Sequence, residues 1–137
     1  MRVYVDSSAL IKRVAIEAES TTLVATLDRY YADRDLLISS SLAWIEVTRA
    51  LHARALSPFA TATVHADAAM SGIAEHPISP EVVSLARRIR PPVLRSLDAI
   101  HLASALLVDA DHMVTYDARL AAACTENSLV VTSPGRA

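Results

Sequence analysis

The chain has 137 residues, of which 53% are hydrophobic and 20% are charged, which excludes an intrinsically disordered protein and predicts one domain over residues 1–137. Its 13 Lys and Arg residues are outnumbered by 15 Asp and Glu residues. The resulting formal net charge of −2 argues at first against a strongly basic nucleic-acid-binding protein. A single cysteine, Cys124, excludes an internal disulfide and a multi-cysteine zinc site.

The N-terminus and the apolar runs carry no membrane signal. No apolar run approaches the ~20 residues that a membrane-spanning helix needs. The first residues reach an acid at Asp6, so no signal peptide is predicted. Together with the lone cysteine, these features lead us to expect a protein of the reducing cytoplasm that has no membrane partner.

Short β-rich runs alternate with longer helical runs along the chain. The predicted elements, in order, are a strand at 2–5, helices at 7–14 and 18–31, a strand at 36–39, helices at 41–56 and 59–75, a strand at 76–79, helices at 81–89 and 94–108, a strand at 112–115, a helix at 118–126 and a strand at 129–132. The Ser57-Pro58 pair is expected to end the third helix. Alternation of this kind predicts a parallel sheet covered on both faces, a three-layer α/β/α sandwich. Functional sites of such sheets lie just beyond the carboxyl ends of the strands.

Two acids directly follow predicted strands. Asp6 comes after the first strand, and Asp117 comes after the strand at 112–115. Taken singly, each is equally well explained as the N-cap of the helix that follows it. Thr115 and Tyr116 offer hydroxyl groups beside the second acid.

Two further acids lie on helices at positions where a solvated charge is not the first expectation. Glu46 is surrounded on its helix by small apolar side chains, or else it forms an i,i+3 pair with Arg49. Asp98 shares a helix face with Leu102, where an ionised carboxylate needs a cation or hydrogen bonds. Its alternatives are a favourable first-turn position in the helix dipole and a pair with Arg95.

The four acids are expected to converge on one pocket. Four carboxylates at close quarters repel each other at pH 7 and are tolerable only with a cation. All-oxygen ligation suits Mg²⁺ or Mn²⁺ rather than zinc. His101 lies three residues after Asp98, but we interpret it as a satisfied histidine on the flank of the helix.

Four segments, in this order and spacing, resemble the PIN-domain nucleases, and most of all the VapC toxins of bacterial type II toxin–antitoxin modules. They read VYVDSSAL, SSLAWIEVTRAL, LRSLDAIHLASAL and VTYDARLAAA. The resemblance spans essentially the whole chain and implies a PIN-like α/β/α sandwich. It also implies an acidic catalytic and metal-binding set at Asp6, Glu46, Asp98 and Asp117. Ser7 matches a supporting hydroxyl position, and Arg95 matches a position that is often basic.

The resemblance implies an Mg²⁺- or Mn²⁺-dependent endoribonuclease that hydrolyses phosphodiester bonds in tRNA or rRNA. A metal ion would lower the pKa of a bound water and polarise a phosphoryl oxygen. VapC toxins are usually homodimers silenced by a VapB-type antitoxin that inserts a basic side chain into the acidic pocket. Five apolar residues on two helices either form the groove for that antitoxin or belong to the core: Leu23, Leu27, Trp44, Val47 and Leu51.

A basic segment leads into the helix of Asp98. Arg87, Arg88 and Arg90 form either a track for RNA phosphates or a solvated helix face. Lys12 and Arg13 are second candidates for that role. If the four site carboxylates are set aside, 11 acids remain against 13 bases, so the net charge no longer argues against a nuclease.

Three alternatives remain. A PIN-domain ribonuclease for RNA processing or turnover without an antitoxin has the same motifs. A non-catalytic doubly wound module, such as a phosphoacceptor receiver, needs paired acids after the first strand and a lysine near the last, whereas the chain has one acid there and its only lysine is Lys12. A haloacid-dehalogenase-like phosphatase needs D-x-D at the first strand, where this chain has Asp6, Ser7 and Ser8.

Overall fold

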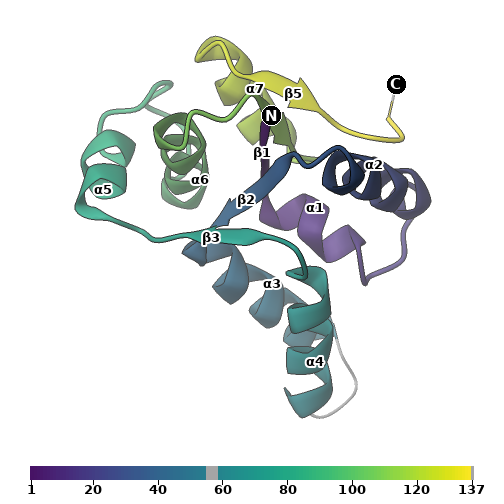
Figure 1. The fold of residues 1–137 in the computed structure, drawn as a ribbon. Coiled ribbons are helices and arrows are strands. Elements are labelled where there is room, and N and C mark those ends of the chain that lie inside the picture. Colours follow the sequence, from purple (N-terminus) through teal and green to yellow (C-terminus); the bar gives the residue numbers. More distant parts are fainter. Residues whose placement is uncertain (55–58, 137) are drawn as a thin grey trace.

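The computed structural model describes residues 1–54 and 59–136, which form a five-stranded, all-parallel sheet in the order β3-β2-β1-β4-β5 (Figure 1). The strands are β1 (Arg2–Val5), β2 (Leu36–Ser40), β3 (Ala74–His76), β4 (His112–Val114) and β5 (Val130–Thr132). The central strand β1 pairs with β2 through Tyr4 and Ile38 and with β4 through Val5 and Val114. Its run of buried apolar residues is typical of a parallel strand covered on both faces.

Seven helices among the described residues cover the two faces of the sheet. They are α1 (Ser7–Lys12), α2 (Ser20–Ala32), α3 (Ser41–Arg54), α4 (Phe59–Ala69), α5 (Pro80–Ala86), α6 (Ser96–Leu107) and α7 (Ala118–Glu126). Figure 1 shows α1 and α2 on one side of the sheet and α5 and α6 on the other. The predicted three-layer α/β/α sandwich is confirmed.

Alternation along the strands divides the core into two clusters. Val3 and Val5 of β1 pack with the buried residues of α1 to α4. Tyr4, which lies between them in sequence, faces the opposite way and packs with Leu102 of α6 and Leu120 of α7. Each β1 residue is therefore committed to one face by the two-residue period of the strand.

The predicted elements differ from the structure most around β3. The helix predicted over 59–75 ends at Ala69, and the strand predicted over 76–79 lies at Ala74–His76. Gly72 has a φ of +76°, a conformation that breaks the helix before the strand, and His76 pairs with Ser40 of β2. The predicted end of the third helix at Leu56, with its Ser57-Pro58 stop, lies outside the described residues.

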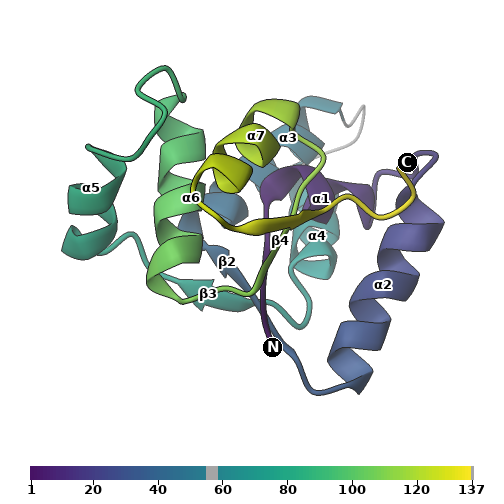
Figure 2. The same cartoon turned by 90° about the horizontal axis from the view of Figure 1, so that it is seen from above.

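The other boundaries agree within a few residues. The helix predicted over 81–89 ends at Ala86, and the one predicted over 94–108 begins at Ser96 because Arg95 has an extended backbone. Within the described residues, no helix is both long enough and apolar enough to span a membrane. In Figure 2, β1 runs upward from the N-terminus, and the α5–α6 loop stands at the upper end, where the strands finish.

Candidate active site

All four predicted acids line one pocket of about 550 Å³ beyond the carboxyl end of β1. Asp6 comes from the junction of β1 and α1, and Glu46 comes from the second turn of α3. Asp98 lies in the first turn of α6, and Asp117 precedes α7. Four segments far apart in the sequence thus bring their carboxylates to one hollow, as the sequence predicts.

Asp6 is the buried base of the pocket, with 4% of its surface exposed. It accepts hydrogen bonds from the Thr115 hydroxyl at 2.6 Å, the Ser8 hydroxyl at 2.7 Å and the Ala9 amide at 3.1 Å. Burial raises the pKa of Asp6, while the nearby His101 and these three hydrogen bonds act in the opposite direction. Asp6 is therefore both the N-cap of α1 and a fixed carboxylate of the pocket, so its two predicted roles coexist.

Glu46 ends a chain of hydrogen bonds that crosses the sheet. One of its oxygens, Oε1, accepts from the Ser7 hydroxyl at 2.6 Å and contacts His101 Nε2, also at 2.6 Å. The other ring nitrogen of His101 lies 2.7 Å from the Tyr4 hydroxyl, which accepts from the Ser40 amide at 3.0 Å. The hydroxyl of Ser7 thus holds one oxygen of Glu46.

The interpretation of His101 as a flanking histidine is wrong. It is buried and lines the pocket in direct contact with Glu46. Its position three residues after Asp98, one turn further along the buried face of α6, is the sequence signal that it belongs to the site. Burial alone raises the pKa of Glu46, but the hydrogen bonds from His101 and Ser7 outweigh it and hold that pKa below its ordinary range.

Asp98 is the least supported of the four carboxylates. It is half-buried, and no described residue gives it a hydrogen bond or an ion pair, so the predicted pair with Arg95 does not form. Its pKa is raised by burial first and then by the negative charge of Asp117, with further contributions from Asp6 and Glu46. The carboxylates therefore repel one another when the pocket contains no cation.

Asp117 caps α7. Its Oδ1 accepts from the amides of Arg119 and Leu120, both at 2.9 Å, and its own amide donates to the Thr115 hydroxyl at 3.0 Å. Thr115 thereby joins Asp6 to the N-cap of α7.

The donor chemistry of the pocket suits a divalent ion that prefers oxygen. Within the described chain, both oxygens of Asp98, one of Glu46 and one of Asp117 have no protein partner. Residues 1–54 and 59–136 contain no group of three His, Cys, Asp or Glu side chains already arranged to hold an ion. The geometric observation that favours a cation here is that four carboxylates line one pocket, where their charges repel one another unless a cation offsets them.

The predicted basic residues lie around the pocket and not within it. Arg87, Arg88 and Arg90 are exposed in and beside the α5–α6 loop and line a neighbouring hollow. Arg95 is exposed at the N-terminus of α6. Arg49 of α3 lines the acidic pocket itself, but Glu46 contacts Ser7 and His101, and the alternative Glu46–Arg49 pair is not formed in the described residues.

Lys12 and Arg13, the second candidates for binding RNA, have structural roles. Lys12 is buried and forms ion pairs with Glu17 and Glu19. Arg13 donates hydrogen bonds to the carbonyls of Ala69 at 2.7 Å and Ser71 at 2.8 Å. The two glutamates neutralise the Lys12 ammonium, and the two carbonyls hold Nη1 of Arg13 against the end of α4, so both side chains stabilise the fold.

The apolar residues suggested as an antitoxin groove belong to the core. Four of them are buried in the cluster that covers one face of β1 and β2: Leu23, Leu27, Val47 and Leu51. The fifth, Trp44, is partly buried against the same cluster. The structure therefore supports the alternative that these five residues belong to the core. The exposed apolar residues at the pocket are instead Ile45 of α3, at 55% exposure, and Leu97 of α6, at 50%.

Known proteins share both this sequence and this fold. The family model described as the PIN domain matches residues 3–126. Ribonuclease VapC47 of Mycobacterium tuberculosis is 37% identical over 135 residues, covering 97% of each chain. Ribonuclease VapC35 of the same organism is 38% identical over 141 residues, covering 98% of each chain.

Solved structures agree with this comparison at the level of fold. VapBC2 from Rickettsia felis, bound to a DNA fragment from their promoter, gives a TM-score of 0.76 at 12% identity, covering 96% of this chain and 98% of that one. VapC20 of Mycobacterium tuberculosis, a sarcin-ricin loop cleaving toxin, gives a TM-score of 0.66 at 19% identity, covering 88% of this chain and 94% of that one. The chain therefore belongs to the PIN-domain family. Its full-length relatives at 37–38% identity are ribonucleases of the VapC group.

Proposed function

We propose that this chain is a divalent-metal-dependent endoribonuclease that hydrolyses phosphodiester bonds of RNA in the acidic pocket. The observation that carries the proposal is the convergence of four carboxylates, from four separate segments, on one hollow at the carboxyl edge of the sheet. The names of the full-length relatives add that the phosphodiester belongs to RNA. Acidic oxygen donors without a zinc-type ligand set favour Mg²⁺ or Mn²⁺.

The residues that would hold the ion are Asp98 and Asp117, with Asp6 and Glu46 contributing directly or through water. When bound, the ion supplies a water of lowered pKa and a positive charge for the phosphoryl oxygens. The protein itself fixes the positions of the carboxylates. Asp6 keeps its position because two hydroxyls and an amide hold both of its oxygens.

Glu46 is suited to orient the attacking water. Ser7 and His101 occupy Oε1 and fix the carboxylate plane, and this leaves Oε2 to accept a hydrogen bond from water. His101 is itself fixed by Tyr4, so a chain of contacts from the buried sheet determines where the carboxylate points. Orientation of a reactant in this way removes rotational freedom before the chemical step.

We further propose that the enzyme is the toxin of a type II toxin–antitoxin module, a homodimer inhibited by a VapB-type antitoxin, with tRNA or rRNA as its substrate. Two structural neighbours are a VapBC pair and a toxin–antitoxin complex from Klebsiella pneumoniae. In this chain, exposed Ile45 and Leu97 border the carboxylates. An apolar rim around an acidic centre suits a peptide that carries an arginine among apolar residues.

A cleavage assay tests the proposed activity. The purified chain is incubated with total tRNA and rRNA in Mg²⁺, in Mn²⁺ and in EDTA, next to the variants Asp6→Asn and Asp98→Asn. Asp67→Asn, an exposed acid on α4, is the matched control. We expect cleavage only with metal, at least 100-fold slower in the two pocket variants and unchanged in the control. Cleavage that survives EDTA and both pocket substitutions would contradict the proposal.

A further inference from the structure

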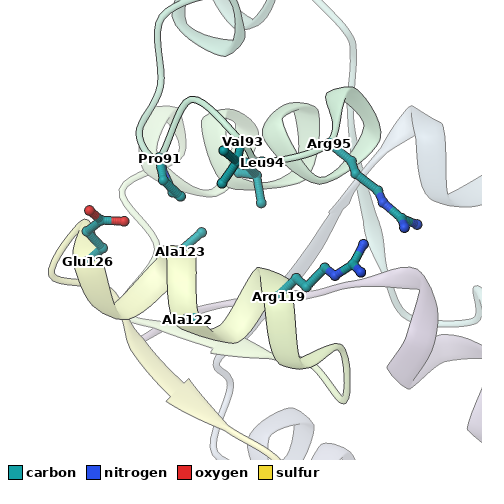
Figure 3. Close-up of a pocket in the computed structure, with 8 residues that line it drawn as sticks. All are labelled: Pro91, Val93, Leu94, Arg95, Arg119, Ala122, Ala123 and Glu126. Atoms are coloured by element: carbon teal, nitrogen blue, oxygen red, sulfur yellow. The ribbon is translucent and has the colours of Figure 1, made fainter.

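A second pocket, of about 390 Å³, lies between the α5–α6 loop and α7 (Figure 3). Its floor is apolar: Pro91, Val93 and Leu94 come from the loop, and Ala122 and Ala123 come from α7. Val93 is 89% exposed. The volume is within the range of small-molecule sites, about 300–1,000 Å³. It shares no lining residue with the acidic pocket.

Two arginines close one end of this second pocket. Figure 3 shows the guanidinium groups of Arg95 and Arg119 extending toward each other and toward the side on which α1 lies. Arg95 precedes Asp98 by three residues, and Arg119 follows Asp117 by two, so each cation is close in sequence to a carboxylate of the acidic pocket. Within the described residues, neither guanidinium has an ion pair or a hydrogen-bond acceptor.

The opposite end of the pocket carries a carboxylate, that of Glu126. On α7 it follows Arg119 by seven residues, two helical turns, and the two alanines lie between them on the same face. The helix rise separates the backbone positions of these two residues by about 10 Å, and Figure 3 shows their side chains at opposite ends of the pocket. Arg119 is in the first turn and Glu126 is in the last, the reverse of what the helix dipole favours. The charges are therefore not explained as stabilising the helix.

We propose that this pocket receives one unstacked nucleotide of the RNA substrate next to the cleavage site. Its phosphate binds Arg95 and Arg119, its base lies on the apolar floor, and an exocyclic amino group of the base donates to Glu126. Guanidinium groups bind phosphate with charge-assisted hydrogen bonds, and a carboxylate accepts from the amino group of cytosine but meets only a carbonyl at that position in uracil. The inference rests on the proposed ribonuclease function.

Charge favours RNA over a second copy of this chain as the occupant. The segment from Val82 to Leu97 contains four arginines and no acid. A two-fold interface built on this patch would bring two copies of this basic segment into one contact, where the two Glu126 carboxylates offset only part of the positive charge. A single-stranded polyanion instead supplies the missing negative charge and a flat ring for the apolar floor.

Binding of short oligonucleotides in EDTA tests the inference without catalysis. Fluorescein-labelled oligo(C) and oligo(U) octamers are titrated with the native chain and followed by anisotropy at several salt concentrations. We expect oligo(C) to bind at least threefold more tightly than oligo(U), and Glu126→Gln to abolish that preference. The double variant Arg95→Ala and Arg119→Ala should weaken both octamers and lower the salt slope by about 0.7, the contribution of the one phosphate that the two arginines bind.

The matched control is Arg29→Ala, which removes an exposed arginine from α2 on the other side of the sheet and should leave both affinities unchanged. Equal binding of the two octamers by the native chain, or a preference that Glu126→Gln does not alter, overturns the proposal. So does a double variant that changes the oligomeric state, measured by light scattering, while RNA affinity is retained. Selective binding by a chain that cleaves no RNA would leave this pocket assigned and remove the ribonuclease function instead.

Discussion

The hydrogen-bond chain behind Glu46 gives the most quantitative prediction, through the variant Tyr4→Phe. The Tyr4 side chain is fully buried, and its hydroxyl has two partners, the Ser40 amide and His101 Nδ1. Removal of the hydroxyl leaves both partners buried and unpaired, at about 1–3 kcal/mol each. We therefore expect a loss of about 2–6 kcal/mol of unfolding free energy. For a chain of this size, that lowers Tm by roughly 6–24 °C.

Urea denaturation and thermal melting measure this loss, with Tyr31→Phe as the control because Tyr31 is 69% exposed on α2. The control should stay within about 0.5 kcal/mol of the native chain. Below the melting range, Tyr4→Phe should also slow RNA cleavage about 10-fold, since His101 no longer fixes Glu46. A destabilisation of less than 0.5 kcal/mol together with an unchanged cleavage rate would refute the reasoning.

Three further predictions concern charge. Changing Arg87, Arg88 and Arg90 to Ala should lower the salt slope of RNA binding by about 2, and an unchanged slope would remove the phosphate track. Lys12→Met should lower Tm, because Glu17 and Glu19 each lose one of their two cationic partners, and should leave the RNA salt slope unaltered; a reduced slope would restore Lys12 as an RNA contact. The pKa of Asp98 is higher in the folded protein than its ordinary value of 3.8, so the folded state holds the proton more tightly than the unfolded state does. The resulting stabilisation is fully present below pH 3.8 and is lost as the pH rises through the folded-state pKa. The Tm of the metal-free Asp98→Asn variant, measured against pH, should therefore lack this decline. A decline equal to that of the native chain would contradict the repulsion between Asp98 and the other pocket carboxylates.

The strands and the acids were predictable because each depends on local signals. The run Val3–Val5 consists of two β-branched valines and a tyrosine, and Asp6 follows it directly, which marks both a strand end and a cap. The carboxyl ends of neighbouring parallel strands share one edge, so Asp6 and Asp117 had to approach each other once β1 and β4 paired. The resemblance to PIN-domain nucleases then joined Glu46 and Asp98 to them.

The role of His101 and the fate of the apolar helix residues were not predictable in the same way. A histidine on a helix can form hydrogen bonds with many kinds of partner, so its sequence position does not identify the partner. The packing of α6 against β1 places His101 between Tyr4 and Glu46. Leu27 and Val47 sit on helix faces that are equally suited to a partner or to the core. Their burial depends on α1 to α4 packing on one face of the sheet, which is a tertiary property.

Mn²⁺ binding followed by electron paramagnetic resonance tests the central claim, that the carboxylate pocket is a divalent-metal site. The native chain, Asp98→Asn and the control Asp67→Asn are each titrated with Mn²⁺ at pH 7.5, and free ion is measured from the hexaaquo signal. We predict that the native chain and the control bind Mn²⁺ alike, and that Asp98→Asn binds at least 10-fold more weakly, because it loses the carboxylate with no protein partner. Equal Mn²⁺ affinity in all three proteins would contradict the account.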